Sequence, residues 1–544
     1  MTETVYASNG FFGQDFGLDL DLVERIEIIH GPTSALYGSN GMLTNINIVT
    51  RSPVDSDRFR AATETDTLGG RKAIVSGAIH LGRGANLLVS GSVFNNRGAA
   101  LYVPDYDSPE TNFGWTSPGS DRERGYHSFA NLLWKDWNLV AYFNSRQKFS
   151  PIPWSPDSLF DDPHSFLLDQ RNFVGGAWSG DSSSGGKLRW QIYFDQYEYR
   201  DYYRFDEGGE TTAYTKHARA EWLSSQLSYR RPVARLRGAV TAGVAAAWEI
   251  RNRQNPWQVW PERREILRVD AADRLHALFL QHELNLSRQW TLVTGLRLDS
   301  SRLYRSALSP RAALVFAQNR DTVWKLVYGR PFRNPSAFEQ FWYDGVSYAP
   351  SGGLKPEHAH AFELSFERRF SPRLRGMVNV FHYSLSDLIQ GVIEADLMRY
   401  RNSAAVRTRG VETELAGELF GRAEFTASFV RQAAHDREAG WMVNSPRSIA
   451  KARVAVPLGG GAWTVAYSTW VLGPRRTLSG NIVARAWVGD LTLSSHRLHP
   501  NFEVILGLRN AFNHAWYDPV AIGVDRIRGD GRHLFVKFIT RVKE

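Results

Sequence analysis

Cysteine is absent from the 544-residue chain, so disulfides, thiolate metal sites and a cysteine nucleophile are all excluded. A chain without thiols also suits an oxidising compartment. The length exceeds that of one ordinary soluble core and predicts more than one domain.

Long apolar runs are absent too. The best candidate, Gly238–Trp248, is flanked by Arg237 and Glu249 and falls well short of the roughly 18 residues that a membrane-spanning helix needs. The mean hydropathy is below zero, as in a soluble protein. A transmembrane β-barrel has the same low average, because lipid-facing and lumen-facing residues alternate along its strands.

A concentrated stripe of one charge is likewise missing. The net charge is +9 and the pI is about 9.5, but Lys and Arg are scattered and interleaved with Asp and Glu. We therefore expect no nucleic-acid partner. Anionic lipid, an anionic ligand and a surface that simply repels its own copies stay open as explanations. The 13% of aromatic residues favours membrane-interface girdles, where amphipathic rings meet both water and lipid.

Apolar and polar residues alternate with a period of two from about residue 58 to the end of the chain. In Lys187–Asp195 the apolar side chains take one face and the charged or amide side chains the other. Leu278–Leu286 repeats the pattern. A soluble half-buried sheet looks the same locally. Persistence over roughly 490 residues, with almost no helical period, predicts a closed barrel.

Two kinds of connection separate these predicted strands. Tight turns are expected at Ser287–Gln289, Arg369–Arg373 and Gly459–Gly461. Long polar loops are expected at Val103–Arg124, Pro151–Asp169, Asp206–Thr215 and Gln340–Lys355. Short turns at one end and long loops at the other are typical of outer-membrane barrels. At about 22 residues per strand and connection, the sequence predicts an all-β, transmembrane antiparallel β-barrel of about 22 strands.

The most specific pattern is residues 23–51, V-E-R-I-E-I-I-H-G-P-T-S-A-L-Y-G-S-N-G-M-L-T-N-I-N-I-V-T-R. Val23–Ile29 predicts a strand, which Gly31-Pro32 ends because proline has no N–H and a fixed φ. Asn45–Thr50 returns to a period of two, with Ile46 and Ile48 on one face. This stretch predicts a compact strand–turn–strand unit.

That unit resembles the closing segment of the plug domain of TonB-dependent outer-membrane receptors, V-E-R-I-E-V-x-R-G-P-x-S-x-L-Y-G-x-x-A-x-G-G-V-I-N-I-I-T-R. The family's Gly-Gly falls at Leu43-Thr44 here, so a close backbone approach that glycine permits is not expected. Further blocks similar to the family's are Arg330–Pro335 with Gly353–Glu357, Arg409–Leu415, and Gly507–Asn513.

The resemblance implies two domains: the C-terminal part of a plug in residues 1–53 and an outer-membrane barrel in residues 54–544. It implies a receptor, not an enzyme, that takes up a ferric siderophore or a similar scarce chelate, with cobalamin as a further candidate. Implied partners are the TonB–ExbB–ExbD system, outer-membrane lipid and lipopolysaccharide, and the small chelate itself, bound by a monomer without a resident cofactor. Against the family pattern, no signal peptide or TonB box precedes the plug segment, and we expect the chain to be a fragment.

Charged residues of the plug segment are candidates for ion pairs with the barrel wall. These are Glu24, Arg25, Glu27 and Arg51. A buried pair of this kind is weak evidence for stability but suits a releasable latch. Ordinary solvated strand charges are the alternative.

Two aromatic clusters are candidates for binding the ligand, because rings offer flat apolar contact and Arg offers bidentate contact to an anionic chelate. The first comprises Tyr197, Tyr199, Tyr202, Tyr203 and Arg204. The second comprises Phe341, Trp342, Tyr343 and Asp344. An interfacial aromatic girdle explains any single ring equally well.

Other chemistry has little support. His358 and His360 share a strand face beside Glu357, but haem receptors of the family carry a His within the stretch that corresponds to residues 336–353, and none is present there. We therefore predict no metal site and no catalytic residues. A passive porin-like or adhesin barrel and a secreted β-rich glycan hydrolase remain as alternative functions.

Overall fold

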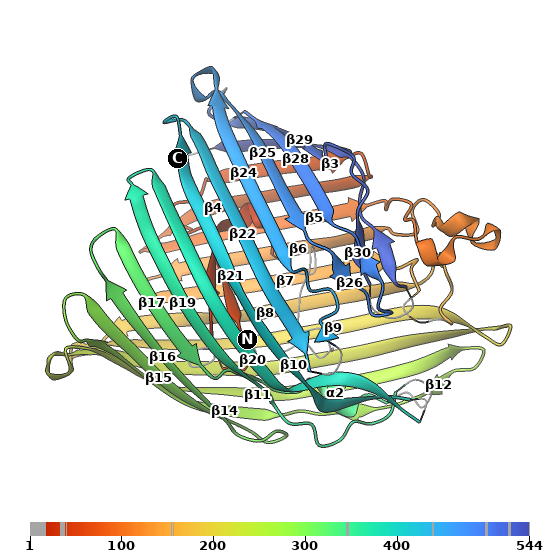
Figure 1. Cartoon of the computed structure of the whole chain (residues 1–544), viewed down its shortest axis with the longest axis horizontal. Coiled ribbons are helices and arrows are strands. Elements are labelled where there is room, and N and C mark those ends of the chain that lie inside the picture. The colour runs from red at the N-terminus through yellow and green to blue at the C-terminus, as the bar shows by residue number, and fades with distance from the viewer. Residues whose placement is uncertain are drawn as a thin grey trace.

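The alternating segments form one closed antiparallel barrel in the computed structural model (Figure 1). The structure describes residues 18–32, 38–39, 41–153, 155, 157–343, 348–395, 397–437, 440–495, 499–520 and 524–542. Within them the barrel has 22 strands, as predicted. The strands are β3 (Phe59–Asp66), β4 (Gly70–Gly82), β5 (Ala85–Asn96), β6 (Glu123–Trp134), β7 (Trp137–Phe149), β8 (Phe166–Asp181), β9 (Lys187–Glu207), β10 (Glu210–Val233), β11 (Gly238–Trp260), β14 (Arg274–Asn285), β15 (Trp290–Ser301), β16 (Ala307–Ala317), β17 (Thr322–Gly329), β19 (Glu357–Ser371), β20 (Leu374–Glu394), β21 (Leu397–Leu419), β22 (Ala423–Asp436), β24 (Ser448–Leu458), β25 (Trp463–Leu472), β28 (Ala486–Ser494), β29 (Phe502–Arg509) and β32 (His533–Val542).

Each barrel strand pairs with its neighbours in chain order, and the first strand closes the ring against the last. In that seam β3 runs antiparallel to β32, from Phe59 opposite Val542 to Asp66 opposite Phe535. The closure matters because an open sheet edge in lipid would leave backbone N–H and C=O groups without partners.

Shorter elements decorate the barrel at its long-loop end. β12 (Arg264–Glu265), β13 (Val269–Asp270), β18 (Phe332–Arg333) and β23 (Gly440–Trp441) extend existing pairings, while β26 (Arg475–Arg476) pairs with β27 (Ile482–Val483) and β30 (Tyr517–Pro519) with β31 (Arg526–Arg528). The helical segments are η2 (Leu20–Leu22), η3 (Pro104–Tyr106), η4 (Pro109–Gly114), η5 (Ala234–Leu236), α2 (Ala337–Phe341) and η6 (Gly459–Gly461). None of the helices in the described ranges is long and apolar enough to cross a membrane.

The two faces of the wall differ in polarity. On β14, Leu278 and Leu280 point outward and are 60% and 53% exposed, whereas the intervening Phe279 is buried toward the lumen. On the neighbouring β15, Leu296 points outward and Arg297 points inward, where it pairs with Asp299 at 2.9 Å. The outside is therefore an apolar belt suited to lipid, and the inside is polar.

Most of the predicted turns and loops are present in the structure at the predicted residues. Tight turns gather along the left and upper rim of Figure 1, and long loops along the right and lower rim. The expected loop at Asp206–Thr215 is wrong, because β9 continues to Glu207 and β10 begins at Glu210. Thr211, Thr212 and Tyr214 favour extended backbone, so pairing continues well beyond the apolar belt.

A separate two-stranded sheet lies inside the barrel. It consists of β1 (Val23–His30) and β2 (Thr44–Thr50), paired antiparallel with Ile28 opposite Ile46. These two isoleucines are more than half exposed, although they lie within the lumen. A lone hairpin is marginally stable, so its attachments to the wall determine whether it stays in place.

The outward apolar belt generates a first prediction. Leu280→Arg should destabilise the barrel by about 2–4 kcal/mol, because the guanidinium would face the hydrocarbon layer. Urea titration of protein folded into phospholipid vesicles measures the difference. Gln281→Arg, one residue away on the lumen face, is the matched control and should cost less than about 1 kcal/mol. Equal costs for the two variants would contradict the assigned faces.

Candidate functional site

Two carboxylates attach the start of the hairpin to the barrel seam. Asp19 caps η2 by accepting a hydrogen bond from the Asp21 N–H at 3.0 Å. Asp19 also pairs with Lys72 of β4 at 2.9 Å. Asp21 pairs with Lys537 of β32 at 2.7 Å and with Arg60 of β3 at 3.4 Å. We call this set of ion pairs the seam clamp, since it contacts both strands that close the barrel.

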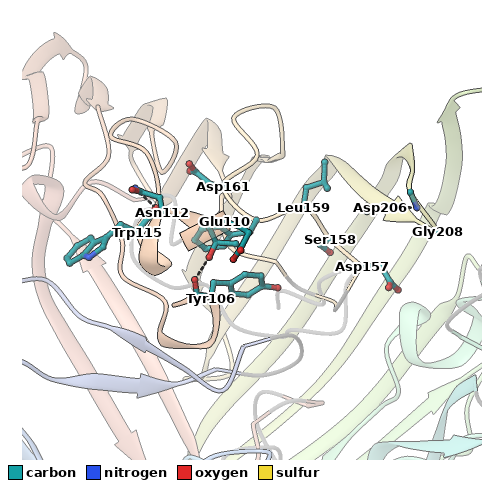
Figure 2. A pocket seen from close by; sticks show the side chains of 13 residues that line it. Tyr106, Glu110, Asn112, Trp115, Asp157, Ser158, Leu159, Asp161, Asp206 and Gly208 are labelled. Atoms are coloured by element: carbon teal, nitrogen blue, oxygen red, sulfur yellow. Dashed lines mark hydrogen bonds between the residues drawn. The ribbon is translucent and has the colours of Figure 1, made fainter. Parts of the chain in front are cut away.

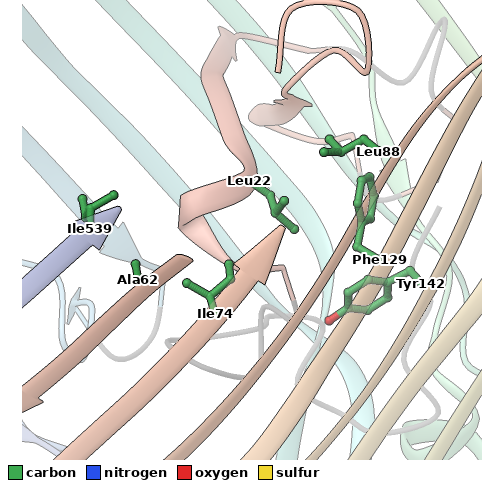
Figure 3. Packing of buried hydrophobic residues seen from close by; sticks show 7 residues of the cluster. All are labelled: Leu22, Ala62, Ile74, Leu88, Phe129, Tyr142 and Ile539. Atoms are coloured by element: carbon green, nitrogen blue, oxygen red, sulfur yellow. The ribbon is translucent and has the colours of Figure 1, made fainter. Parts of the chain in front are cut away.

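An apolar contact lies beside the seam clamp. Leu22 is 2% exposed and belongs to a cluster of buried apolar side chains from six different strands (Figure 3). The other members are Ala62, Ile74, Leu88, Phe129, Tyr142 and Ile539. Complete burial of one Leu side chain contributes roughly 1.5–3 kcal/mol. The clamp therefore combines charge pairing with a packed anchor.

Burial alone would raise the pKa of the Asp21 carboxyl, but Lys537, Arg60 and Lys72 outweigh burial and hold that pKa below its ordinary value. Arg51, which follows β2, lies near the same cluster, and burial together with the neighbouring Arg60 lowers its pKa. The Asp21 carboxylate is thus ionised at neutral pH.

The other end of the hairpin meets the opposite side of the wall. A Cβ on Gly329 of β17 would lie 2.4 Å from Pro32 Cγ, so the segment after β1 and strand β17 are in close contact there. A Cβ on Gly31 would likewise lie 3.2 Å from the Glu363 carboxylate of β19. Ser39 Oγ accepts a hydrogen bond from the Asn334 N–H at 3.1 Å. Residues 18–32 therefore cross the lumen from the seam to β17 and β19, and Ser39 contacts the same side.

Of the four charged residues predicted to bridge plug and barrel, three pair with one another within the hairpin. Arg25 pairs with Glu24 at 2.9 Å and with Glu27 at 2.7 Å, all three being well exposed. Glu27 also accepts from Asn47 Nδ2 of β2, which links the two strands of the hairpin. Arg51 differs from these three, because it lies close to charged groups of the wall, Arg60 of β3 and Arg541 of β32.

Sequence reasoning missed Asp19 and Asp21. A signal was available in D-L-D-L at residues 19–22, where an N-cap Asp precedes a short apolar turn before β1. The pattern does not reveal the partners, because Lys72, Arg60 and Lys537 reach the site only when the barrel closes.

The predicted tyrosine cluster divides between the two faces of β9. Tyr197 and Tyr199 face the lumen, where their hydroxyls donate to Asp169 at 2.7 Å and to Asp201 at 3.0 Å. Tyr203 is an even number of positions from these two residues, so it lies on the same face of β9, and it is half-buried.

The alternate residues of β9 lie on its other face. Tyr202 stacks on Phe166, with ring centroids 6.2 Å apart, and Arg204 pairs with Asp162 of the loop between β7 and β8. Burial would raise the pKa of Asp162, but Arg204 and the Ser165 hydroxyl hold it below its ordinary value.

The second predicted cluster lies over the lumen mouth. Trp342, directly after α2, is 2% exposed and stacks on Phe338 with centroids 5.0 Å apart. The ammonium of Lys216 on β10 lies 5.2 Å from the Trp342 ring. In the wall, β11, β14, β15, β16 and β17 separate β10 from β19. The segment with α2 therefore folds inward across the mouth and approaches the lumen-facing β9–β10 wall. Tyr343 is partly exposed, and Asp344 lies outside the described residues.

A buried ion network fixes that segment. Arg333 donates to Glu357 at 2.6 and 2.7 Å and to Glu339 at 2.9 and 3.0 Å. Ser336 and Glu339 form a capping box that starts α2. Burial opposes the charge, yet the two carboxylates raise the pKa of Arg333 above its ordinary value. The guanidinium is therefore charged at any working pH and holds α2 to β19.

A cavity of about 330 Å³ lies between the plug segment and the wall. Ser39, Phe332 and Asn334 line one side of it, and Arg297 and Asp299 of β15 line another. It borders the same stretch that carries α2.

The histidine pair offers no metal centre. His360 is exposed and contacts the Tyr328 hydroxyl at 3.1 Å, while Glu357 faces inward to Arg333. No group of three or more potential metal ligands occurs in the described part of the chain.

Comparison with known proteins decides the family. Residues 44–511 match the family described as TonB dependent receptor-like, beta-barrel. The chain belongs to this family. TonB-dependent receptors lie in the outer membrane, and they are receptors and transporters rather than enzymes.

Individual relatives are more distant. The vitamin B12 transporter BtuB of Vibrio cholerae is 22% identical over 410 residues, which is 68% of this chain and 56% of that protein. This chain thus matches little more than half the length of that curated relative. The pyoverdine outer membrane receptor FpvA from Pseudomonas aeruginosa PAO1 has a TM-score of 0.79 at 12% identity, covering 96% of this chain and 84% of its own. The siderophore receptor PiuA from Acinetobacter baumannii has a TM-score of 0.74 at 12% identity, covering 95% and 86%. These two likenesses show the fold.

The seam clamp generates a second prediction. Asp21→Asn removes a charge-assisted pair worth about 1.5–3 kcal/mol. Hydrogen-exchange protection of the β1 amides should fall about ten- to a hundredfold, since about 1.4 kcal/mol corresponds to a factor of ten. Exchange detected by mass spectrometry measures it. Glu24→Gln, which breaks only an exposed pair, should change protection less than about fivefold.

Acid should have the same effect as Asp21→Asn. The folded-state pKa of Asp21 is lowered, so its stabilisation is complete above the ordinary Asp value of about 3.9 and is lost as the pH falls through the folded-state value. The variant should therefore lack the loss of β1 attachment that the unmodified chain shows below about pH 4. The same loss in both proteins would show that Asp21 is not the titrating group.

The far contact generates a third prediction. Gly329→Ala places a Cβ against the Pro32 ring and should weaken that attachment by about 1–3 kcal/mol. Exchange of the β1 and β2 amides should rise while that of β14 and β15 stays unchanged. Gly91→Ala, whose Cβ meets no atom within 4 Å, is the control. Unchanged hairpin exchange in Gly329→Ala would exclude this contact as an anchor.

Proposed function

We propose that this TonB-dependent receptor takes up a ferric siderophore or a similar scarce chelate across the outer membrane, with cobalamin as the second candidate. The single observation that carries the proposal is the inward-folded α2 segment. It presents Trp342 beside Lys216 at the mouth and is bonded through Asn334 to Ser39 of the plug segment. A ligand-facing element and the plug are thus physically joined.

The division of the chain follows the same proposal. Residues 1–53 are the C-terminal part of a plug, and residues 54–544 are the barrel. Support comes from the separate β1–β2 sheet, attached at the seam by Asp21 and at the opposite wall by Pro32. The exposed Ile28 and Ile46 offer the hairpin an apolar face on which further plug structure packs.

The proposed mechanism is binding followed by mechanical release. The ligand is captured by the lumen-facing Tyr197, Tyr199 and Tyr203 together with Trp342 and Tyr343. Tyr202 and Arg204, on the other face of β9, support this surface by holding Phe166 and the loop at Asp162. Arg51, which lies near charged groups of the wall, acts as a releasable plug contact, while Glu24, Arg25 and Glu27 pair with one another within the hairpin. TonB, driven by ExbB and ExbD, pulls the plug and shifts the chain toward a state of lower ligand affinity, so that the ligand is released inward.

The surroundings complete the proposal. The outward Leu rows contact lipid and lipopolysaccharide, and the long-loop end faces the exterior. The receptor works as a monomer and needs no resident cofactor. Siderophore chelates are favoured because Trp and Tyr rings combine with cationic side chains at the mouth, a pairing that suits flat anionic chelates.

Ligand titration provides the fourth prediction. Purified protein in detergent, titrated with ferric pyoverdine, ferric enterobactin and cyanocobalamin, should show quenching of tryptophan fluorescence with one of these ligands at submicromolar concentration. Trp342→Ala should weaken that binding by about 2–3 kcal/mol, roughly thirty- to a hundredfold. Trp134→Ala, in a tight turn at the far end, is the control.

A passive barrel would behave differently. It would bind none of the three ligands, and in planar bilayers it would conduct ions steadily with the plug segment in place. That pair of results would replace uptake with a porin-like function.

A further inference from the structure

A second cavity lies among the outer loops, away from the lumen mouth. It has a volume of about 770 Å³, within the range of small-molecule sites. The loop between β5 and β6, with η3 and η4, forms one wall (Figure 2). The loop between β7 and β8 and the β9–β10 turn form the other wall.

The walls of this loop pocket are bonded to each other. The rings of Tyr106 and Phe160 stack with centroids 4.5 Å apart and planes 9° apart. Asp161 Oδ2 accepts from the Ser117 N–H at 2.9 Å and from its hydroxyl at 2.6 Å. The Asp206 N–H donates to the Asp157 carbonyl at 2.9 Å. The pocket is therefore preformed rather than a chance gap between loose loops.

The charge of the pocket opposes that of the chain. Its lining contains four carboxylates, Glu110, Asp157, Asp161 and Asp206, and no Lys or Arg. In the described ranges none of the four forms an ion pair, whereas Glu123, Asp195 and Glu339 elsewhere in this +9 chain are each paired with an Arg. Asp161 Oδ1 is buried without a hydrogen-bond partner. Hydrogen bonds with its own backbone N–H and the Ser108 hydroxyl lower the pKa of Glu110, which keeps that carboxylate ionised.

Aromatic surface completes the lining. Tyr106, Trp115 and Phe160 contribute rings, so an occupant meets π-faces as well as negative charge. Rings beside carboxylates favour ammonium and guanidinium groups, through cation–π attraction and ion pairing. A bare metal ion fits poorly, because no three potential ligands of the described chain converge on one point.

We propose that the loop pocket binds an organic cation, namely the ammonium- or guanidinium-bearing part of the transported chelate. This inference rests on the proposed uptake function for the identity of the larger ligand, and on the pocket alone for the charge. The mouth residues then hold the anionic chelate, while the loop pocket selects chelates that carry a positively charged, partly aromatic arm.

A matched pair of dyes supplies the fifth prediction. N-Methylacridinium, a flat permanent cation, should bind the purified chain in detergent with quenched fluorescence, whereas acridine-9-carboxylate, its anionic counterpart, should not. The double variant Glu110→Gln/Asp157→Asn should raise the Kd for the cation about tenfold. Added salt should weaken binding to the unmodified chain more than binding to the variant. Glu210→Gln, an exposed carboxylate beside the pocket but outside its lining, should leave the Kd unchanged.

The outcomes separate this inference from the function on which it rests. Equal Kd values for the unmodified chain and the double variant, or equal binding of both dyes, would overturn the cation site. Unchanged heat-modifiable mobility on gels verifies that the variants are folded. If the cationic dye binds as expected but none of the three chelates binds, the uptake function is overturned and the cation site is retained.

Discussion

Backbone hydrogen bonding in lipid is the constraint on which the rest of the structure depends. Every N–H and C=O group in the hydrocarbon layer must be satisfied within the protein. A meander of 22 strands achieves this only when β3 and β32 meet, and their eight-residue register from Phe59 to Asp66 completes the ring. The seam joins strands from opposite ends of the sequence, so it brings together residues that no local pattern connects.

The same closure leaves a wide interior. A barrel of this size encloses a lumen too wide for wall side chains to fill. Residues 18–32 cross it and are held by Asp19 and Asp21 at the seam and by Pro32 at the opposite wall, where Ser39 also contacts Asn334. The two attachments differ in kind. Ion pairs in a polar lumen weaken when water or a competing charge enters, whereas the close contact of Pro32 with Gly329 depends only on shape.

The sequence predicted the barrel well, because the alternation of apolar and polar residues within each strand shows which face meets lipid and which meets the lumen. Leu278, Leu280 and Leu296 lie outward as their spacing requires, and the strand number follows from the average spacing of the turns. The family assignment came from residues 23–51, whose pattern is rare enough to carry it, and the match over residues 44–511 confirms it. Where prediction failed, strand pairing extended past the membrane: the threonines after Asp206 form a hairpin that composition suggested was a loop.

The candidate site was far less accessible to sequence reasoning. Tyr197 and Tyr202 looked equivalent in the sequence, yet they are five positions apart, and strand positions separated by an odd number point to opposite faces. Arg25 looked available to the wall, but Glu24 and Glu27 on its own strand compete for it at closer range. Asp21 finds Lys537 more than five hundred residues away. Short-range charge patterns therefore misdirect whenever a nearer partner exists, and long-range pairs are invisible until the ring closes.

The α2 segment shows why the mouth and the plug cannot be treated as independent parts. Arg333 holds Glu339 and Glu357 together, and the Ser336–Glu339 capping box fixes the start of the helix. Asn334 and Pro335 connect Arg333 to the helix start at Ser336, and the Asn334 N–H donates to the Ser39 hydroxyl. A short element braced by buried charges moves as a unit rather than bending. The proposed ligand contact at Trp342 and the proposed movement of Ser39 therefore act on the two ends of the same short unit, which couples them in the proposed mechanism.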